Sequence, residues 1–364
     1  MKGEVFLTGA TGFIGSGLLG KWLAVEPDVR VNLLVRGRRG ERPQDRVARV
    51  LAETCPGMDV AGLAGRVRAI PGDISLGQFG LQPEEYRGLA ERTSHIIHCA
   101  AAVRFDLPLE EARATNVAGS ENAVALARTC KRLERLDYVG TAYVAGRRTG
   151  VIKEEELDKG QEHNNTYERT KLESEKMMRQ AMKDLPITVL RPSIVICDSR
   201  TGRISQYSAI FRVLRMYHLG YLRMLPGNPS TLMDIVPVDY VADVIYAIGQ
   251  NSESLGKCYH LAAGPAGMTS LEEVVELAAQ HFGRERLALV SPREFDALVA
   301  GRAGELSEDE RNMIDEIGIY RPYLASSPEF DTSNTLKVAG RAGITLPPIR
   351  SYFGRMAACI RSMS

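Results

Sequence analysis

The residues with the clearest chemical potential are Tyr167 and Lys171, which stand four positions apart in a stretch with a helical pattern. In an α-helix this spacing places both side chains on one face, one turn apart. A tyrosine hydroxyl with its ordinary pKa of about 10 is a poor acid–base catalyst near neutral pH. Because a nearby ammonium group favours the tyrosinate, it brings this pKa toward the working range. The pair therefore predicts proton transfer by Tyr167.

A third residue of this kind is Thr141, which directly follows an apolar run over residues 136–140. Such a run predicts a buried strand, and a hydroxyl group at its end could hydrogen-bond a substrate carbonyl oxygen. The spacing of Tyr167 and Lys171 occurs by chance in many helices. Its weight comes from its position downstream of Thr141 and of a glycine-rich loop near the start of the chain.

That loop is the sharpest local pattern in the chain, and it contains Gly9, Gly12 and Gly15. It follows an apolar run over residues 5–7 and opens an apolar helical segment, which is the context that a dinucleotide-binding loop requires. One glycine permits a tight turn, one lets a pyrophosphate approach the backbone, and one lets helix and strand pack closely. The phosphates would lie on free N–H groups at the helix N-terminus.

The choice between NADH and NADPH depends on the end of the second predicted strand, where Arg36, Arg38 and Arg39 occur. An NAD enzyme usually has an acidic residue there for the ribose 2′-hydroxyl, whereas arginine accommodates a 2′-phosphate. The first acid after this strand is Glu41. A guanidinium fork suits phosphate, so we predict NADPH over the alternative of an ordinary solvated basic turn.

The elements that must position these residues alternate between short apolar runs and longer helical patterns. Buried strands are predicted over residues 5–7, 31–35, 67–71, 95–99, 136–140, 187–190 and 257–262. Helices are predicted over residues 15–25, 43–53, 111–131, 166–183, 207–224 and 238–250. This alternation predicts an α/β fold with a doubly wound parallel sheet of the Rossmann type.

The regular alternation weakens after residue 192, which predicts a smaller, mostly helical substrate lobe toward the C-terminus. We expect residues 1–194 and 234–264 to form the NADPH-binding domain, and residues 195–233 and 265–364 to form the lobe. A basic helical stretch from Phe211 to His218, with Arg223, has three interpretations. It could bind coenzyme A phosphates, it could be an amphipathic helix with a solvated face, or it could lie on a membrane surface.

Composition excludes several classes of protein. Lys and Arg total 46 against 45 Asp and Glu among 364 residues, so no broad nucleic-acid surface is expected. The six cysteines contain no C-x-x-C pair, and His95 and His98 would point to opposite faces of one strand. We therefore expect reduced thiols and no metal site. No apolar run reaches the length of a membrane span, about 18 residues, and we expect a cytoplasmic protein without a signal peptide.

Together, these motifs resemble the extended short-chain dehydrogenase/reductase superfamily, and the resemblance covers most of residues 3–262. It implies that Thr141 orients the substrate carbonyl, that Tyr167 is the proton donor, and that Lys171 contacts the nicotinamide ribose. It implies a supporting role for Asn116 in the cofactor and proton-relay region. The residues expected to contact the cofactor are Gly9, Thr11, Gly12, Phe13, Ile14, Gly15, Arg36, Arg38, Arg39, Asp73, Ile74, Ala100, Ala101, Ala102, Tyr167, Lys171, Pro192 and Ser193.

Within the superfamily, the stretches at residues 31–36, 72–81, 233–243, 330–334 and 346–348 resemble the thioester reductase and fatty acyl-CoA reductase branch. The resemblance implies an acyl thioester substrate on coenzyme A or on a separate carrier protein, reduced to an aldehyde and possibly on to an alcohol. We expect a monomer or homodimer, since the resemblance implies that many relatives pair into dimers. The alternatives are an epimerase, dehydratase or ketone reductase for a sugar nucleotide, steroid-like or flavonoid-like substrate, and a non-catalytic NADPH sensor.

Overall fold

The protein is described here from a computed structural model, which covers residues 3–37, 40–55, 57, 60–63, 65–204, 209–301, 304, 308–325 and 328–363. Seven strands form one sheet in the order β3-β2-β1-β4-β5-β7-β12, and every neighbouring pair is parallel. The strands are β1 (Glu4–Thr8), β2 (Arg30–Val35), β3 (Val67–Pro71), β4 (Thr93–His98), β5 (Arg135–Val139), β7 (Ile187–Pro192) and β12 (Cys258–Leu261). The prediction of a doubly wound parallel sheet is confirmed.

Helices cover both faces of this sheet, which explains why its strands are apolar on both sides. One face carries α1 (Phe13–Val25), α2 (Pro43–Thr54), α8 (Val238–Gly249) and α12 (Ser333–Arg341), whose buried side chains share a core with the sheet. The other face carries α4 (Pro83–Arg92), α5 (Leu109–Thr129) and α6 (Thr166–Ala181), which share a second core with it. Strand order reverses direction between β1 and β4, and ligands of such sheets bind at that crevice.

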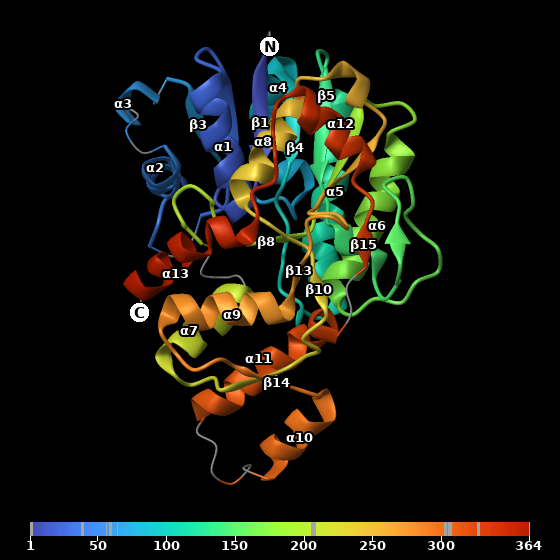
Figure 1. Cartoon of the computed structure of the whole chain (residues 1–364). Coiled ribbons are helices and arrows are strands. Elements are labelled where there is room, and N and C mark those ends of the chain that lie inside the picture. Colours follow the sequence, from blue (N-terminus) through green and yellow to red (C-terminus); the bar gives the residue numbers. More distant parts are fainter. Residues whose placement is uncertain are drawn as a thin grey trace.

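The smaller lobe lies beyond the carboxyl ends of the strands, below the sheet in Figure 1. It has its own apolar core, contributed mainly by helices and short strands. The helices are α7 (Ala209–Leu219), α9 (Leu271–Phe282), α10 (Pro292–Gly301), α11 (Glu308–Ala325) and α13 (Phe353–Ser362). The strands are β8 (Ile194–Val195), β9 (Met224–Pro226), β10 (Leu232–Met233), β11 (Ile235–Val236), β13 (Thr269–Ser270) and β14 (Ala288–Val290).

Short elements connect these layers. They are α3 (Val60–Leu63), η1 (Gly77–Gly80), η2 (Ala142–Ala145), β6 (Val151–Ile152), η3 (Ser252–Ser254), β15 (Glu329–Phe330) and η4 (Ile349–Ser351). The pairing of β6 with β15 brings the C-terminal part of the chain back to the sheet, and α12 then packs beside α8 and β12 (Figure 1). The division at residues 194, 233 and 264 stays a prediction.

Two elements differ from the sequence-based expectation. The helix expected over residues 207–224 is shorter, because α7 ends at Leu219 and Met224 already belongs to β9, while residues 207 and 208 lie outside the described part. Helix α4 was not predicted, although Pro83 stands in its first turn with two acidic residues after it. Among the described residues, no helix has both the length and the apolar character that crossing a bilayer requires.

Candidate active site

The glycine loop joins β1 to α1, and each of its three glycines meets a different constraint. Gly9 has a φ of +80°, and a side chain there would lie 2.6 Å from the backbone nitrogen of Ala100. At Gly15, a Cβ atom would overlap the carbonyl oxygen of Gly9, so this glycine allows α1 to pack against the loop. Gly12 has an ordinary extended backbone, with φ −87° and ψ 171°, where any residue is sterically allowed.

The surroundings of Gly12 fit a pyrophosphate. A Cβ atom on Gly12 would meet only the carbonyl oxygen of Gly9, at 3.2 Å, among the described atoms. Helix α1 begins directly after it with Phe13 and Ile14, and no side chain caps the helix among the described residues. The first turn also contains no acid. The loop therefore offers open space and backbone N–H groups to an anion, as the glycine pattern predicts.

Next to this loop, the end of β2 carries Arg36, whose side chain is 67% exposed and lies 3.5 Å from the carboxylate of Asp73. Burial alone would raise the pKa of Asp73, but hydrogen bonds from Ser75 and the charge of Arg36 lower it. Asp73 is therefore ionised, which leaves its oxygens as acceptors at the place where an adenine amino group is expected. Arg38 and Arg39 lie outside the described residues.

Sequence reasoning missed Arg46, a buried arginine that α2 directs toward the same corner. Its guanidinium donates to the hydroxyl of Thr11 at 3.1 Å and to the backbone carbonyl of Arg36. Thr11 lies in the glycine loop, so one buried cation joins that loop to the end of β2. Arg46 is hard to recognise from the sequence, because it lies inside a helical pattern and belongs to no known motif.

Asn116 on α5 connects the cofactor loop after β4 to the helix that carries the tyrosine. Its side-chain oxygen accepts from the backbone N–H of Ala102 at 2.7 Å, and its amide group donates to the carbonyl of Ala102 at 3.2 Å. The same amide group donates to the hydroxyl of Thr170 at 3.0 Å. Asn116 therefore holds the backbone of the Ala100, Ala101 and Ala102 segment against α6. Nearby, a Cβ atom on Gly119 would contact the side chain of Ile74.

Thr141 and Tyr167 come together although 26 positions separate them in the sequence. The hydroxyl of Thr141 lies near enough to the phenol of Tyr167 to lower its pKa, and it lies 3.5 Å from the carbonyl oxygen of Pro192. The backbone N–H of Ser193 is fixed by the carbonyl of Leu261 at 3.2 Å. The carboxyl ends of β5 and β7 therefore bring two hydroxyl groups and the Pro192–Ser193 segment to one place.

Lys171 lies one turn further along α6 than Tyr167, and its ammonium group is held by β5. The nitrogen donates to the carbonyl oxygen of Val139 at 2.9 Å and lies 4.5 Å from the ring centre of Tyr138. Burial lowers the pKa of Lys171 to about 8. The charge of this lysine is thus sensitive to its surroundings near neutral pH.

The pKa of Tyr167 moves in the opposite direction from the one expected. Burial raises it to about 12, and the hydrogen bond with Thr141 offsets this only in part. Removing the phenol from water disfavours its charged form, and in the protein alone this outweighs any influence of Lys171. The phenol is consequently protonated at neutral pH, which is the state that a proton donor requires.

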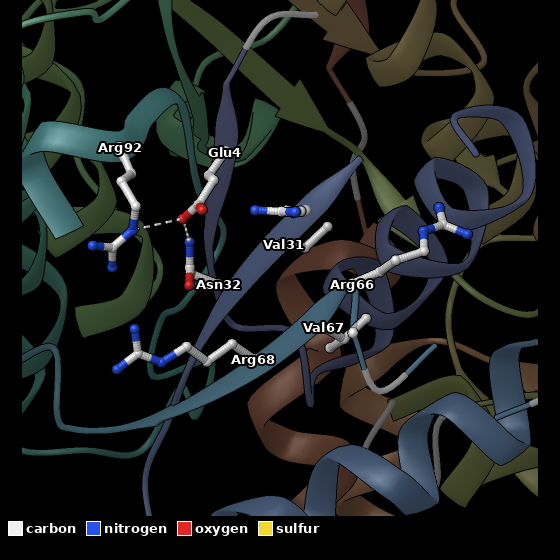
Figure 2. Close-up of a pocket in the computed structure, with 9 residues that line it drawn as sticks. Glu4, Val31, Asn32, Arg66, Val67, Arg68 and Arg92 are labelled. Atoms are coloured by element: carbon white, nitrogen blue, oxygen red, sulfur yellow. Dashed lines mark hydrogen bonds and ion pairs between the residues drawn. The ribbon is translucent and has the colours of Figure 1, made fainter. Parts of the chain in front are cut away.

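A separate cavity of about 270 Å³ lies at the amino ends of β1, β2 and β3, at the opposite edge of the sheet. Figure 2 shows Glu4 between Arg92 and Asn32, joined to both by hydrogen bonds. Arg68, on the same wall, pairs with Glu85 at 3.0 Å. These polar groups satisfy one another, and none of the predicted site residues lines the cavity.

Comparisons with known proteins agree with this geometry. An NAD-binding family described as Male sterility protein matches residues 7–245. The nonribosomal peptide synthetase asaC of Aspergillus flavus is 36% identical over 272 residues, which is 71% of this chain and 26% of that protein. A putative fatty acyl-CoA reductase of Drosophila melanogaster, CG8303, is 29% identical over 286 residues, 68% of this chain and 51% of the relative.

The chain thus spans between a quarter and about half of the length of these two relatives. Among solved structures, the terminal R domain from the myxalamid PKS-NRPS biosynthetic pathway superposes with a TM-score of 0.83 and 29% identity, over 99% of this chain and 90% of that one. The family match covers more than half of the chain and contains the glycine loop, Thr141, Tyr167 and Lys171. The chain therefore belongs to the Male sterility protein family, within the thioester reductase and fatty acyl-CoA reductase branch of the extended short-chain dehydrogenases/reductases.

Proposed function

We propose that this protein is an NADPH-dependent reductase of acyl thioesters, with the acyl group carried by coenzyme A or by a separate carrier protein. The observation that carries the proposal is the meeting of two hydroxyl groups, Thr141 after β5 and Tyr167 on α6, in a fold whose glycine loop is suited to a dinucleotide. The names of the relatives support a thioester as the substrate, because one relative is described as a putative fatty acyl-CoA reductase. As an expectation, the protein works in the cytoplasm as a monomer or homodimer.

In the proposed reaction, the glycine loop and Arg36 would hold NADPH, which when bound would supply a hydride for the thioester carbonyl carbon. The hydroxyl groups of Thr141 and Tyr167 stabilise the charge that develops on the carbonyl oxygen. Tyr167 then transfers its proton to that oxygen, and Lys171 assists in restoring it. The resulting hemithioacetal separates into an aldehyde and a free thiol. A second hydride and proton would convert the aldehyde into an alcohol.

A panel of substrates tests this function directly. The protein is incubated with NADPH and acyl-CoAs of different chain length, while a simple ketone and a UDP-sugar serve as rival substrates. We expect NADPH to be oxidised when acyl-CoA is the substrate, and not with the ketone or the UDP-sugar. Mass spectrometry should then detect an aldehyde or alcohol and free coenzyme A. Turnover of the ketone or the UDP-sugar, with no reaction of any thioester, would contradict the proposal.

Arg36 provides a test of cofactor choice. Replacing it with alanine removes an exposed cation beside the predicted adenosine ribose, where a 2′-phosphate would form charge-assisted hydrogen bonds. We expect the Kd for NADPH to rise about tenfold, which corresponds to about 1.4 kcal/mol, while the Kd for NADH stays unchanged. Fluorescence titration with both nucleotides measures this. Arg30→Ala, at the opposite sheet edge, serves as the control. Equal weakening of both nucleotides by Arg36→Ala would argue against 2′-phosphate recognition.

A further inference from the structure

The first turn of α6 is fixed by a reciprocal cap. Asn165 is the residue before the helix, and its side-chain oxygen accepts from the backbone N–H of Glu168 at 2.9 Å. In return, the carboxylate of Glu168 accepts from the backbone N–H of Asn164 at 2.8 Å. Such caps satisfy backbone donors that the helix leaves free and define where the helix begins. Tyr167 lies inside this turn, so its placement depends on the cap.

The substrate lobe contributes a third member to this cap. Tyr323 on α11 accepts from the side-chain amide of Asn165 at 2.8 Å, and it donates its own hydroxyl to the carboxylate of Glu168. Glu168 has no exposed surface, and a buried carboxylate is costly unless donors surround it. One hydroxyl from the lobe therefore binds both halves of the cap that holds the tyrosine helix.

The ring of Tyr323 approaches the same place through Phe105, in the segment that follows β4. Phe105 stacks on Tyr167 with ring centres 5.6 Å apart and planes at 22°, and its centre lies 5.6 Å from that of Tyr323. The hydroxyl of Thr166 holds this segment to α6 by donating to the carbonyl of Leu107 at 2.8 Å. Tyr323 thus touches the surroundings of Tyr167 both through polar groups and through rings.

We propose that Tyr323 is a positioning residue that holds the lobe helix α11 on the first turn of α6. Its hydroxyl contacts Asn165 and Glu168, on either side of Tyr167 in the sequence. Its hydroxyl keeps the cap of Asn165 and Glu168 closed, and its ring keeps Phe105 on Tyr167, so that the phenol retains a fixed orientation. The expected effect on kcat rests on the proposed function, whereas the effect on the first turn of α6 does not. A small displacement of a catalytic group is costly, because the reacting atoms must align.

The test is Tyr323→Phe, which keeps the ring and removes only the hydroxyl. The matched control is Tyr246→Phe on α8, because the hydroxyl of Tyr246 likewise donates to a carboxylate, that of Glu26 at 2.6 Å, and lies on the other face of the sheet from α6. We expect Tyr323→Phe to lower kcat for an acyl-CoA about tenfold, with the Kd for NADPH unchanged. Hydrogen exchange followed by mass spectrometry should show faster exchange at residues 165–170 and in α11. Tyr246→Phe should change neither kcat nor exchange at residues 165–170.

Unchanged exchange at residues 165–170 in Tyr323→Phe would overturn the inference, and so would an equal loss of kcat in Tyr246→Phe. Faster exchange with an unchanged kcat would also overturn it, because the turn would then not position the phenol. If the wild-type protein reduces no thioester, the proposed function fails. The exchange difference between the two variants then decides by itself whether Tyr323 holds the turn.

Discussion

Tyr167→Phe is expected to lower kcat for thioester reduction by roughly 10²- to 10⁴-fold, the usual contribution of a positioned general acid. The variant keeps the ring that stacks on Phe105, so the packing of the site should survive. It loses the proton and one of the two hydroxyl groups that would stabilise the developing oxyanion. NADPH binding should change little, since the glycine loop and the arginines are untouched. Steady-state kinetics and a fluorescence titration measure the two quantities.

A matched control for this variant is Tyr246→Phe. The hydroxyl of Tyr246 on α8 donates to the carboxylate of Glu26 at 2.6 Å, on the other face of the sheet. Its loss should leave kcat within about twofold, because surface polar contacts contribute little. If Tyr167→Phe retained the full rate, another group would have to supply the proton. An unchanged biological activity of Tyr167→Phe would instead favour a non-catalytic NADPH sensor.

Much of the fold could be predicted because its information is local. The strands of a parallel sheet covered on both faces are short, largely apolar runs, and the apolar centres of β1 and β7 could be recognised in this way. Helix α4 was not predicted because it has few apolar positions. It buries only Tyr86, Leu89 and Ala90. The end of α7 was placed too late because the apolar residues continue from the helix into β9.

The candidate site shows the same difference between local motifs and contacts that depend on the whole fold. The glycine loop and the Tyr167 and Lys171 pair were recognisable from their spacing together with their order along the chain. Contacts between distant segments were not. Arg46 reaches Thr11 across 35 positions, and Tyr323 reaches Glu168 across 155. The pKa of Tyr167 was predicted in the wrong direction for a similar reason, because the depth at which a side chain lies depends on the whole fold.

Gly12→Ala separates the role of the glycine loop in binding from its role in folding. Gly12 has a backbone conformation open to any residue, and its added Cβ would meet only the carbonyl of Gly9, at 3.2 Å, among the described atoms. Stability should therefore change by less than about 1 kcal/mol. The methyl group would, however, occupy the space that a pyrophosphate needs at the helix N-terminus. We expect the Kd for NADPH to rise at least about tenfold.

Gly15→Ala is the matching variant, in which we expect the stability of the fold to fall, rather than NADPH binding to the folded protein. Its Cβ would overlap the carbonyl oxygen of Gly9, so α1 must move away from the loop, at a cost of about 1–3 kcal/mol for such overpacking. Urea unfolding of both variants, with NADPH titration of the folded protein, distinguishes the two effects. A Gly12→Ala protein that binds NADPH as tightly as the wild type would place the pyrophosphate elsewhere. In that case the glycines would serve only the packing of α1 on the sheet, and the assignment of the cofactor site would have to be abandoned.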